Sequence, residues 1–119
     1  MPKNIQEGIN KILYSGKLSY GKYGRAFEQK LSEYIDQKNV LTVSTYNQAM
    51  LILLSTLGLK PGDEVIASPV SCLASNQPFV VRGLKVVWAD VNPLAGTLCI
   101  DDVRLKITSK TKAIFHNHY

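Results

Sequence analysis

The segment at residues 43–48 has the residue types of an anion-binding turn. A β-branched run ends at Val43, and a turn through Thr45 leads to a helical pattern that starts near Asn47. A strand, a sharp turn and a helix start point free backbone N–H groups and the positive end of a helix dipole at a bound anion such as phosphate. The same residues would also serve as a plain helix cap. The sequence leaves both interpretations open.

A second group of polar residues ends the last predicted strand and consists of His116, Asn117 and His118. The period of two in a strand places both imidazoles on one face, close enough to share a metal ion. We nevertheless predict no metal site, and His118 is either a structural histidine or a ligand contact. The carboxyl end of a strand is where open α/β sheets bind their ligands.

Three further candidates lie in loops or turns. Tyr20 and Lys22 belong to the glycine-broken segment GKLSYGKYG, where they are either ligand contacts or parts of a solvated loop. Cys72 is either a small buried apolar side chain or part of a binding surface. With Cys99 it forms no CxxC pattern, so we expect reduced thiols and a cytoplasmic protein.

The periodicity predicts the elements that must position these residues. Helical spacing recurs at Ile5–Leu13 and Phe27–Ile35, and a third helix, apolar nearly all round and therefore expected to be buried, spans residues 47–58. Short β-branched runs alternate with helical segments, which predicts an α/β fold with a mainly parallel sheet covered by helices on both faces. We expect strands at residues 40–43, 64–67, 85–89 and 113–115, and Trp88 in the core.

The composition excludes several classes of protein. The 119 residues are 45% hydrophobic and 19% charged, which suits one compact domain. No apolar run approaches the roughly 18 residues of a membrane span, and the first residues lack a secretory signal. The net charge of +5 comes from scattered lysines and arginines, without the basic run and aromatic stripe of nucleic-acid binders. We therefore expect neither a membrane nor a nucleic-acid partner.

Four motifs in one order resemble the DegT/DnrJ family of nucleotide-sugar aminotransferases. They are a GDEVI turn and strand, the pair Ala74-Ser75, a VVWADV strand, and ITSKTKAI followed by a histidine. Upstream, Gly21 followed by Phe27-Glu28 is similar to the start of that family, and VSTYNQAMLILLSTLGL occupies the place of its Ser-Gly-Thr helix. The resemblance covers the whole chain. A Rossmann-type dinucleotide binder is disfavoured because no GxGxxG motif follows a predicted strand.

The resemblance implies a pyridoxal phosphate (PLP) enzyme and gives the candidates roles in it. Thr45, Tyr46 and Asn47 would form the cradle of the PLP phosphate, and Cys72 and Ser75 would lie along its ring. The family's Ser-Gly-Thr is changed here, so the bulky Tyr46 stands where glycine normally lets the backbone approach the phosphate. Tyr20, Lys22 and His118 would contact substrate. The family's Schiff-base lysine and pyridine-pairing aspartate fall beyond Tyr119.

The resemblance implies one incomplete domain of a PLP-transferase, aminotransferase fold type I. Residues 1–38 would form N-terminal helices and a loop, and residues 39–119 the first part of the PLP-binding α/β domain. The expected partners are a nucleotide-linked keto-sugar, an amino donor such as glutamate, and a second copy in a homodimer. Alone, the chain is expected to be inactive. The alternative is a non-catalytic binding or dimerisation module derived from the family.

Overall fold

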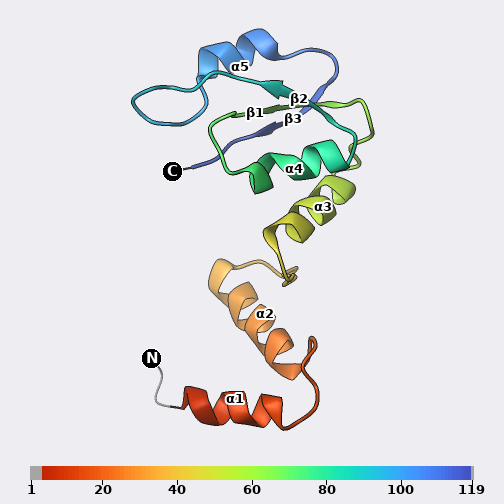
Figure 1. Ribbon diagram of the computed structural model, residues 1–119, viewed down its shortest axis with the longest axis vertical. Coiled ribbons are helices and arrows are strands. Elements are labelled where there is room, and N and C mark those ends of the chain that lie inside the picture. The colour runs from red at the N-terminus through yellow and green to blue at the C-terminus, as the bar shows by residue number, and fades with distance from the viewer. Residues whose placement is uncertain (1–3, 119) are drawn as a thin grey trace. The chain divides into compact units, whose positions relative to one another are not determined.

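The computed structural model describes residues 4–118 and divides into two compact units between Thr42 and Val43. The first unit holds helix α1, Ile5–Leu13, and helix α2, Lys22–Ile35 (Figure 1). Both helices confirm the predicted amphipathic segments. Helix α2 begins earlier than expected, so the loop before it is shorter than the glycine pattern indicated.

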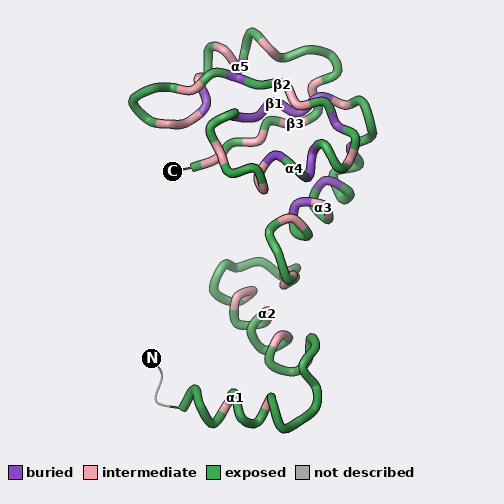
Figure 2. Tube along the Cα trace, viewed as in Figure 1, coloured by how far each residue is buried: buried purple, intermediate pink, exposed green. Residues whose placement is uncertain are grey.

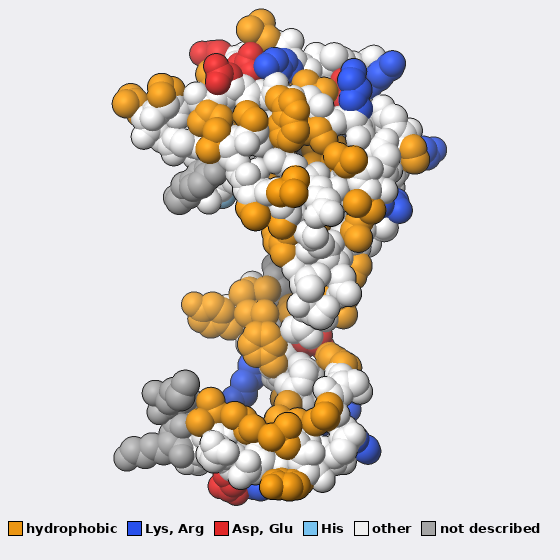
Figure 3. All heavy atoms as spheres, in the orientation of Figure 1, with side chains coloured by type: hydrophobic (Ala, Val, Ile, Leu, Met, Phe, Trp, Pro, Cys, Tyr) orange, Lys and Arg blue, Asp and Glu red, His pale blue; other side chains and the backbone are white. Residues whose placement is uncertain are grey.

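The described part of the first unit has no buried residue (Figure 2). Hydrophobic side chains lie on its surface (Figure 3). Leu13 and Phe27, for example, are each 57% exposed. Two short helices joined by a loop cannot enclose a core by themselves. Most of the stability of a helix comes from packing its apolar face against another element, and the apolar faces of these two helices remain exposed. The unit therefore depends on local contacts that tie the loop to α2.

The second unit is an α/β layer structure whose elements follow one another along the chain. They are α3 Tyr46–Thr56, β1 Glu64–Ala67, α4 Leu73–Val81, β2 Lys85–Trp88, α5 Ile100–Lys106 and β3 Thr111–Phe115. The strands form one sheet in the order β2-β1-β3, and both pairings are parallel. The α/β class and the parallel sheet are thus confirmed.

Strand β1 is the centre of this unit, and all of its residues are buried. Alternate side chains point to opposite faces of a strand. Val65 and Ala67 pack with α3 and α4, whereas Ile66 packs with Val103 of α5. Figure 1 shows α4 and α5 on opposite faces of the sheet. The prediction of helices on both faces is confirmed.

Three expectations were wrong. Residues 40–43 form no strand, because no other described segment pairs with them, and an extended run becomes a strand only with a ladder partner. Trp88 ends the outer strand β2 and is 46% exposed. Helix α3 buries only Met50 and Leu54 and leaves Leu53 47% exposed.

Candidate functional site

The start of α3 is capped in a way that leaves donors free. The hydroxyl of Thr45 accepts a hydrogen bond from the Gln48 N–H at 3.2 Å. The Gln48 amide oxygen in turn accepts from the N–H and the hydroxyl of Ser44, at 3.3 and 2.8 Å. This is a variant of the capping box, in which a T-x-x-Q pattern closes the first turn reciprocally.

The cap uses only one of the unpaired donors of the helix. Within residues 4–118, the backbone N–H groups of Tyr46 and Asn47 have no hydrogen-bond acceptor. No acidic residue occupies the first turn, so the positive end of the helix dipole is not neutralised locally. Helix capping and anion binding are therefore compatible here, because they use different groups.

Buried polar atoms near the starts of α3 and α4 also lack partners. Asn47 donates from Nδ2 to Gln77 of α4 at 3.5 Å, which joins the first turn of α3 to α4. Asn76 donates from Nδ2 to the Ser68 carbonyl at 3.2 Å and to the Ser71 hydroxyl at 2.7 Å. The Oδ1 atoms of Asn47 and Asn76 are buried without a donor among the described residues. An unpaired buried acceptor is costly, so these atoms favour a ligand or water that donates to them.

The start of α4 presents the two residues expected along the cofactor ring. Cys72 is the N-cap of α4, and its thiol is exposed rather than buried. The interpretation of Cys72 as a small core residue is therefore wrong. Ser75 lies one turn on, is half-buried, and donates its N–H to the Cys72 carbonyl at 2.9 Å.

The histidines beyond β3 lie against each other. The ring centroids of His116 and His118 are 4.6 Å apart with an interplanar angle of 86°. Both side chains are exposed, and their contact confirms that the two rings lie on one face. No group of three or more potential metal ligands occurs in the described part of the chain.

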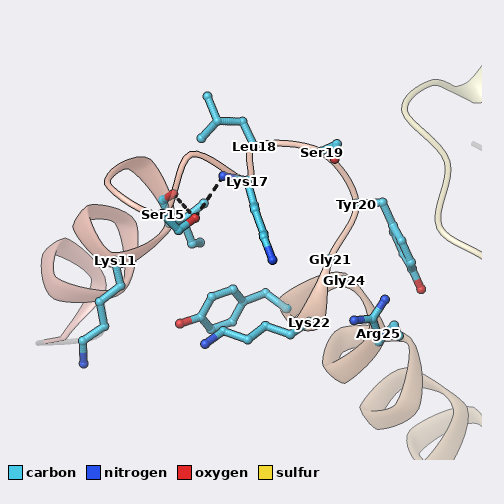
Figure 4. A pocket seen from close by; sticks show the side chains of 12 residues that line it. Lys11, Ser15, Lys17, Leu18, Ser19, Tyr20, Gly21, Lys22, Gly24 and Arg25 are labelled. Carbon is cyan, nitrogen blue, oxygen red and sulfur yellow. Dashed lines mark hydrogen bonds between the residues drawn. The ribbon is translucent and has the colours of Figure 1, made fainter.

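In the first unit, Tyr20 and Lys22 line one cavity of about 830 Å³ (Figure 4). Tyr20 is fixed from two sides. Its hydroxyl donates to the Glu28 carboxylate, and its ring packs so closely on Gly24 that an added Cβ there would lie 2.9 Å from it. The Arg25 guanidinium lies 5.9 Å from the same ring.

Glu28 holds the loop to the segment that leads into the second unit. Besides the Tyr20 hydroxyl, the carboxylate accepts from the N–H and the hydroxyl of Thr42, each at 2.7 Å. The hydrogen bond from Tyr20 and then those from Thr42 lower the pKa of Glu28, while the Glu28 bond and partial burial raise the pKa of Tyr20. Both shifts keep the acceptor ionised and the donor protonated at neutral pH.

Several site residues were missed from the sequence. The T-x-x-Q capping pattern would have identified Gln48. Lys17 and Arg25 line the cavity with Tyr20 and Lys22, yet they stood out only as scattered charges. Glu28 was noted only as part of a family pattern, and nothing in its spacing to Tyr20 and Thr42 predicted a contact.

No helix in the described part of the chain has both the length and the apolar character needed to cross a membrane. Both cysteines are free thiols, as predicted.

Comparison with known proteins places these features in a family context. A 3-oxo-glucose-6-phosphate:glutamate aminotransferase of Bacillus subtilis is 35% identical over 98% of this chain and 26% of its own length. A GDP-perosamine synthase of Vibrio cholerae is 34% identical over 97% of this chain and 32% of its own. The chain therefore spans about a quarter to a third of the relatives that it matches.

Solved structures agree with the sequence matches. The crystal structure of NtdA from Bacillus subtilis with bound cofactor PMP has a TM-score of 0.89 and 32% identity, covering 96% of this chain and 26% of that one. An E. coli GDP-4-keto-6-deoxy-D-mannose-3-dehydratase with bound hydrated PLP has a TM-score of 0.86 and 25% identity, covering 98% and 31%. The model of the DegT/DnrJ/EryC1/StrS aminotransferase family matches residues 1–119. The chain belongs to that family.

Proposed function

We propose that this chain contributes part of the cofactor and substrate site of a PLP-dependent aminotransferase that acts on a nucleotide-linked keto-sugar, with glutamate as amino donor. The observation that carries this proposal is the start of α3, where two backbone N–H groups remain free beside a complete cap. PLP, when bound, supplies the electron sink for amino transfer. A relative at 35% identity is named as a glutamate aminotransferase, which supports amino transfer over dehydration.

In this proposal the PLP phosphate is bound by backbone rather than by side chains. The N–H groups of Tyr46 and Asn47 donate to it, and the helix dipole adds to the attraction. Thr45 acts indirectly, because its hydroxyl is already occupied by the Gln48 N–H. The Tyr46 side chain is 48% exposed, so it has room to turn away from a bound phosphate.

The remaining candidates take positions around the cofactor and substrate. Cys72, exposed at the start of α4, lies along the cofactor ring with Ser75 behind it. His118, beyond the carboxyl end of β3, contacts substrate, because ligands of parallel sheets collect at that edge. Tyr20 and Lys22 contact the nucleotide-sugar from the cavity of the first unit.

We further propose a cytoplasmic homodimer for the whole protein. The free thiols suit a reducing compartment. The absence of any buried residue in the described part of the first unit suits a surface that another polypeptide covers.

A double change at the cradle tests the backbone-binding proposal. Tyr46→Gly with Asn47→Thr restores the family pattern in a chimera in which residues 1–119 replace the matching segment of the Bacillus subtilis aminotransferase. We expect PLP to bind more tightly by about 1 kcal/mol, the free energy of one added hydrogen bond. The measurement is a titration of the apoenzyme with PLP, followed by absorbance. Unchanged or weaker binding would place the phosphate elsewhere.

The 119-residue chain itself is expected to lack activity, because the family's Schiff-base lysine has no counterpart in it. Incubation with PLP, borohydride reduction and mass mapping should detect no stoichiometric pyridoxyl-lysine. A single modified lysine together with turnover of a keto-sugar nucleotide would contradict this expectation.

A further inference from the structure

His116 and His118 are the two histidines of the chain, and the fold brings their side chains together. They follow β3 with the alternation of an extended segment, so both are exposed while Asn117 between them is half-buried. Within residues 4–118, neither imidazole forms a hydrogen bond or an ion pair. The ring nitrogens are therefore available to a ligand.

The distance between the two rings matches that of two imidazoles on one metal ion. A zinc ion lies about 2.1 Å from the nitrogen of a histidine ligand, and the ring centre lies about 1.1 Å behind that nitrogen. At ligand angles of about 90–109°, two such rings have centroids about 4.5–5.2 Å apart. The centroids of His116 and His118 are 4.6 Å apart. The spacing of a chelate thus exists before an ion binds.

The orientation of the rings also suits a shared ion. Their planes make an angle of 86°, and a ring can rotate about its bond to a metal without changing the bond length. The contact between the rings restricts both side chains, so less conformational entropy is lost when an ion binds than would be lost by two independent side chains. The pair is therefore partly preorganised.

The donor set indicates which ions fit. Imidazole nitrogens suit zinc, copper and nickel, whereas magnesium and calcium prefer oxygen ligands. A structural zinc site takes four protein ligands, and the described part of the chain has no group of three or more potential ligands. Two histidines therefore leave coordination positions open to water. The sequence predicted no metal site here, because the spacing of the histidines gives their common face and not the distance between their rings.

We propose that His116 and His118 form a two-histidine chelate for one divalent transition-metal ion of the nickel, copper and zinc class, with water completing the coordination. The inference goes beyond the proposed aminotransferase function, because it depends on the ring geometry after β3 and on neither PLP nor a sugar. An ion held there would occupy a nitrogen of His118, the side chain expected to contact substrate.

Titration of the untagged 119-residue chain with Ni²⁺ tests the chelate. Calorimetry gives affinity and stoichiometry, and paramagnetic broadening of backbone amide signals gives the location. We expect one ion per chain, broadening centred on residues 115–118, and no comparable binding of Mg²⁺. The net charge of +5 disfavours nonspecific attraction of cations, so saturable binding would indicate ligation.

Histidine variants measure the contribution of each ring. His116→Ala and His118→Ala should each weaken Ni²⁺ binding at least about tenfold, because the second imidazole binds as an intramolecular ligand. Both side chains are exposed, so the variants should keep the circular dichroism spectrum of the wild type.

Two further variants serve as controls. Asn117→Ala changes the residue between the histidines, whose side chain belongs to the opposite face, and it should leave the affinity unchanged. Cys72→Ser removes the exposed thiol, which is another ligand for transition metals, and it should also leave the affinity unchanged.

Unchanged affinity in either histidine variant would overturn the chelate, and loss of binding in Cys72→Ser would assign the ion to the thiol instead. Two chains per ion would show bridging between molecules, and no saturable Ni²⁺ binding up to about 1 mM would overturn the site itself. Because neither PLP nor substrate is present, these failures are separate from a failure of the cofactor proposal, which is tested at α3.

Discussion

Removing the Phe79 side chain should destabilise the layer that carries α4. Phe79 is 1% exposed, and its ring lies 5.2 Å from that of Phe115 at an interplanar angle of 68°. It packs in the same cluster as Met50 and Leu54 of α3. Phe79→Ala therefore leaves a cavity at the junction of α3, α4 and the sheet. We expect the free energy of unfolding to fall by about 3–5 kcal/mol.

The neighbouring residue offers a matched control. Val80 is next on α4 but is 67% exposed, so Val80→Ala should change the free energy of unfolding by less than about 0.5 kcal/mol. Urea unfolding followed by far-ultraviolet circular dichroism and Trp88 fluorescence measures both. Similar midpoints for the two variants would refute the packing of α4 on β1 and β3 through Phe79.

Two further changes test the local chemistry. The Glu64 carboxylate accepts hydrogen bonds from Thr108 at 2.7 Å and from Lys85 at 2.9 Å, and these bonds lower the pKa of Glu64. The ionised carboxylate therefore stabilises the fold fully above the ordinary pKa of 4.5, and this contribution is lost as the pH falls through the lowered pKa. Glu64→Gln should be less stable at neutral pH and lose less on acidification; parallel acid unfolding curves for wild type and variant would contradict this. Thr45→Ala should lower the free energy of unfolding by about 1 kcal/mol, whereas Thr45→Ser should leave it almost unchanged because serine keeps the capping hydroxyl. Urea titrations measure both variants, and equal losses would show that the hydroxyl does not cap the helix.

Periodicity predicted the elements whose partners lie within the chain. The segments at residues 64–67, 85–89 and 113–115 became strands because each has a parallel neighbour, with β1 between the other two. Residues 40–43 have a similar β-branched composition, yet no described strand pairs with them. The local sequence determines how strongly a segment favours extended backbone, but a β-strand also needs a second segment to which its backbone can hydrogen-bond.

Burial was less predictable than secondary structure. Helix α3 is apolar nearly all round, which predicted cover on most sides, but Ile52 is 42% and Leu53 47% exposed. An apolar pattern shows that burial of the side chains is favourable, but it does not identify the surface that would cover them. Trp88 differs from expectation for the same reason, since it lies on an outer strand.

The candidate site also has a part that the sequence predicted and a part that it did not. Residues 45–47 could be placed at a helix start because a cap has a local signature. The cavity could not be predicted, because Lys17, Tyr20 and Arg25 come together only through a hydrogen bond to Glu28 and a contact on Gly24. Such contacts depend on the path of the loop, which its glycines leave open.

The central claim, that the start of α3 binds the PLP phosphate through its backbone, can be tested by determining the structure of the chimera with PLP bound. We predict that the N–H groups of Tyr46 and Asn47 both lie within hydrogen-bond distance of phosphate oxygens, with the Tyr46 ring turned away and the Thr45 hydroxyl still accepting from Gln48. A phosphate held by other residues, with the Tyr46 and Asn47 N–H groups directed at water, would contradict it.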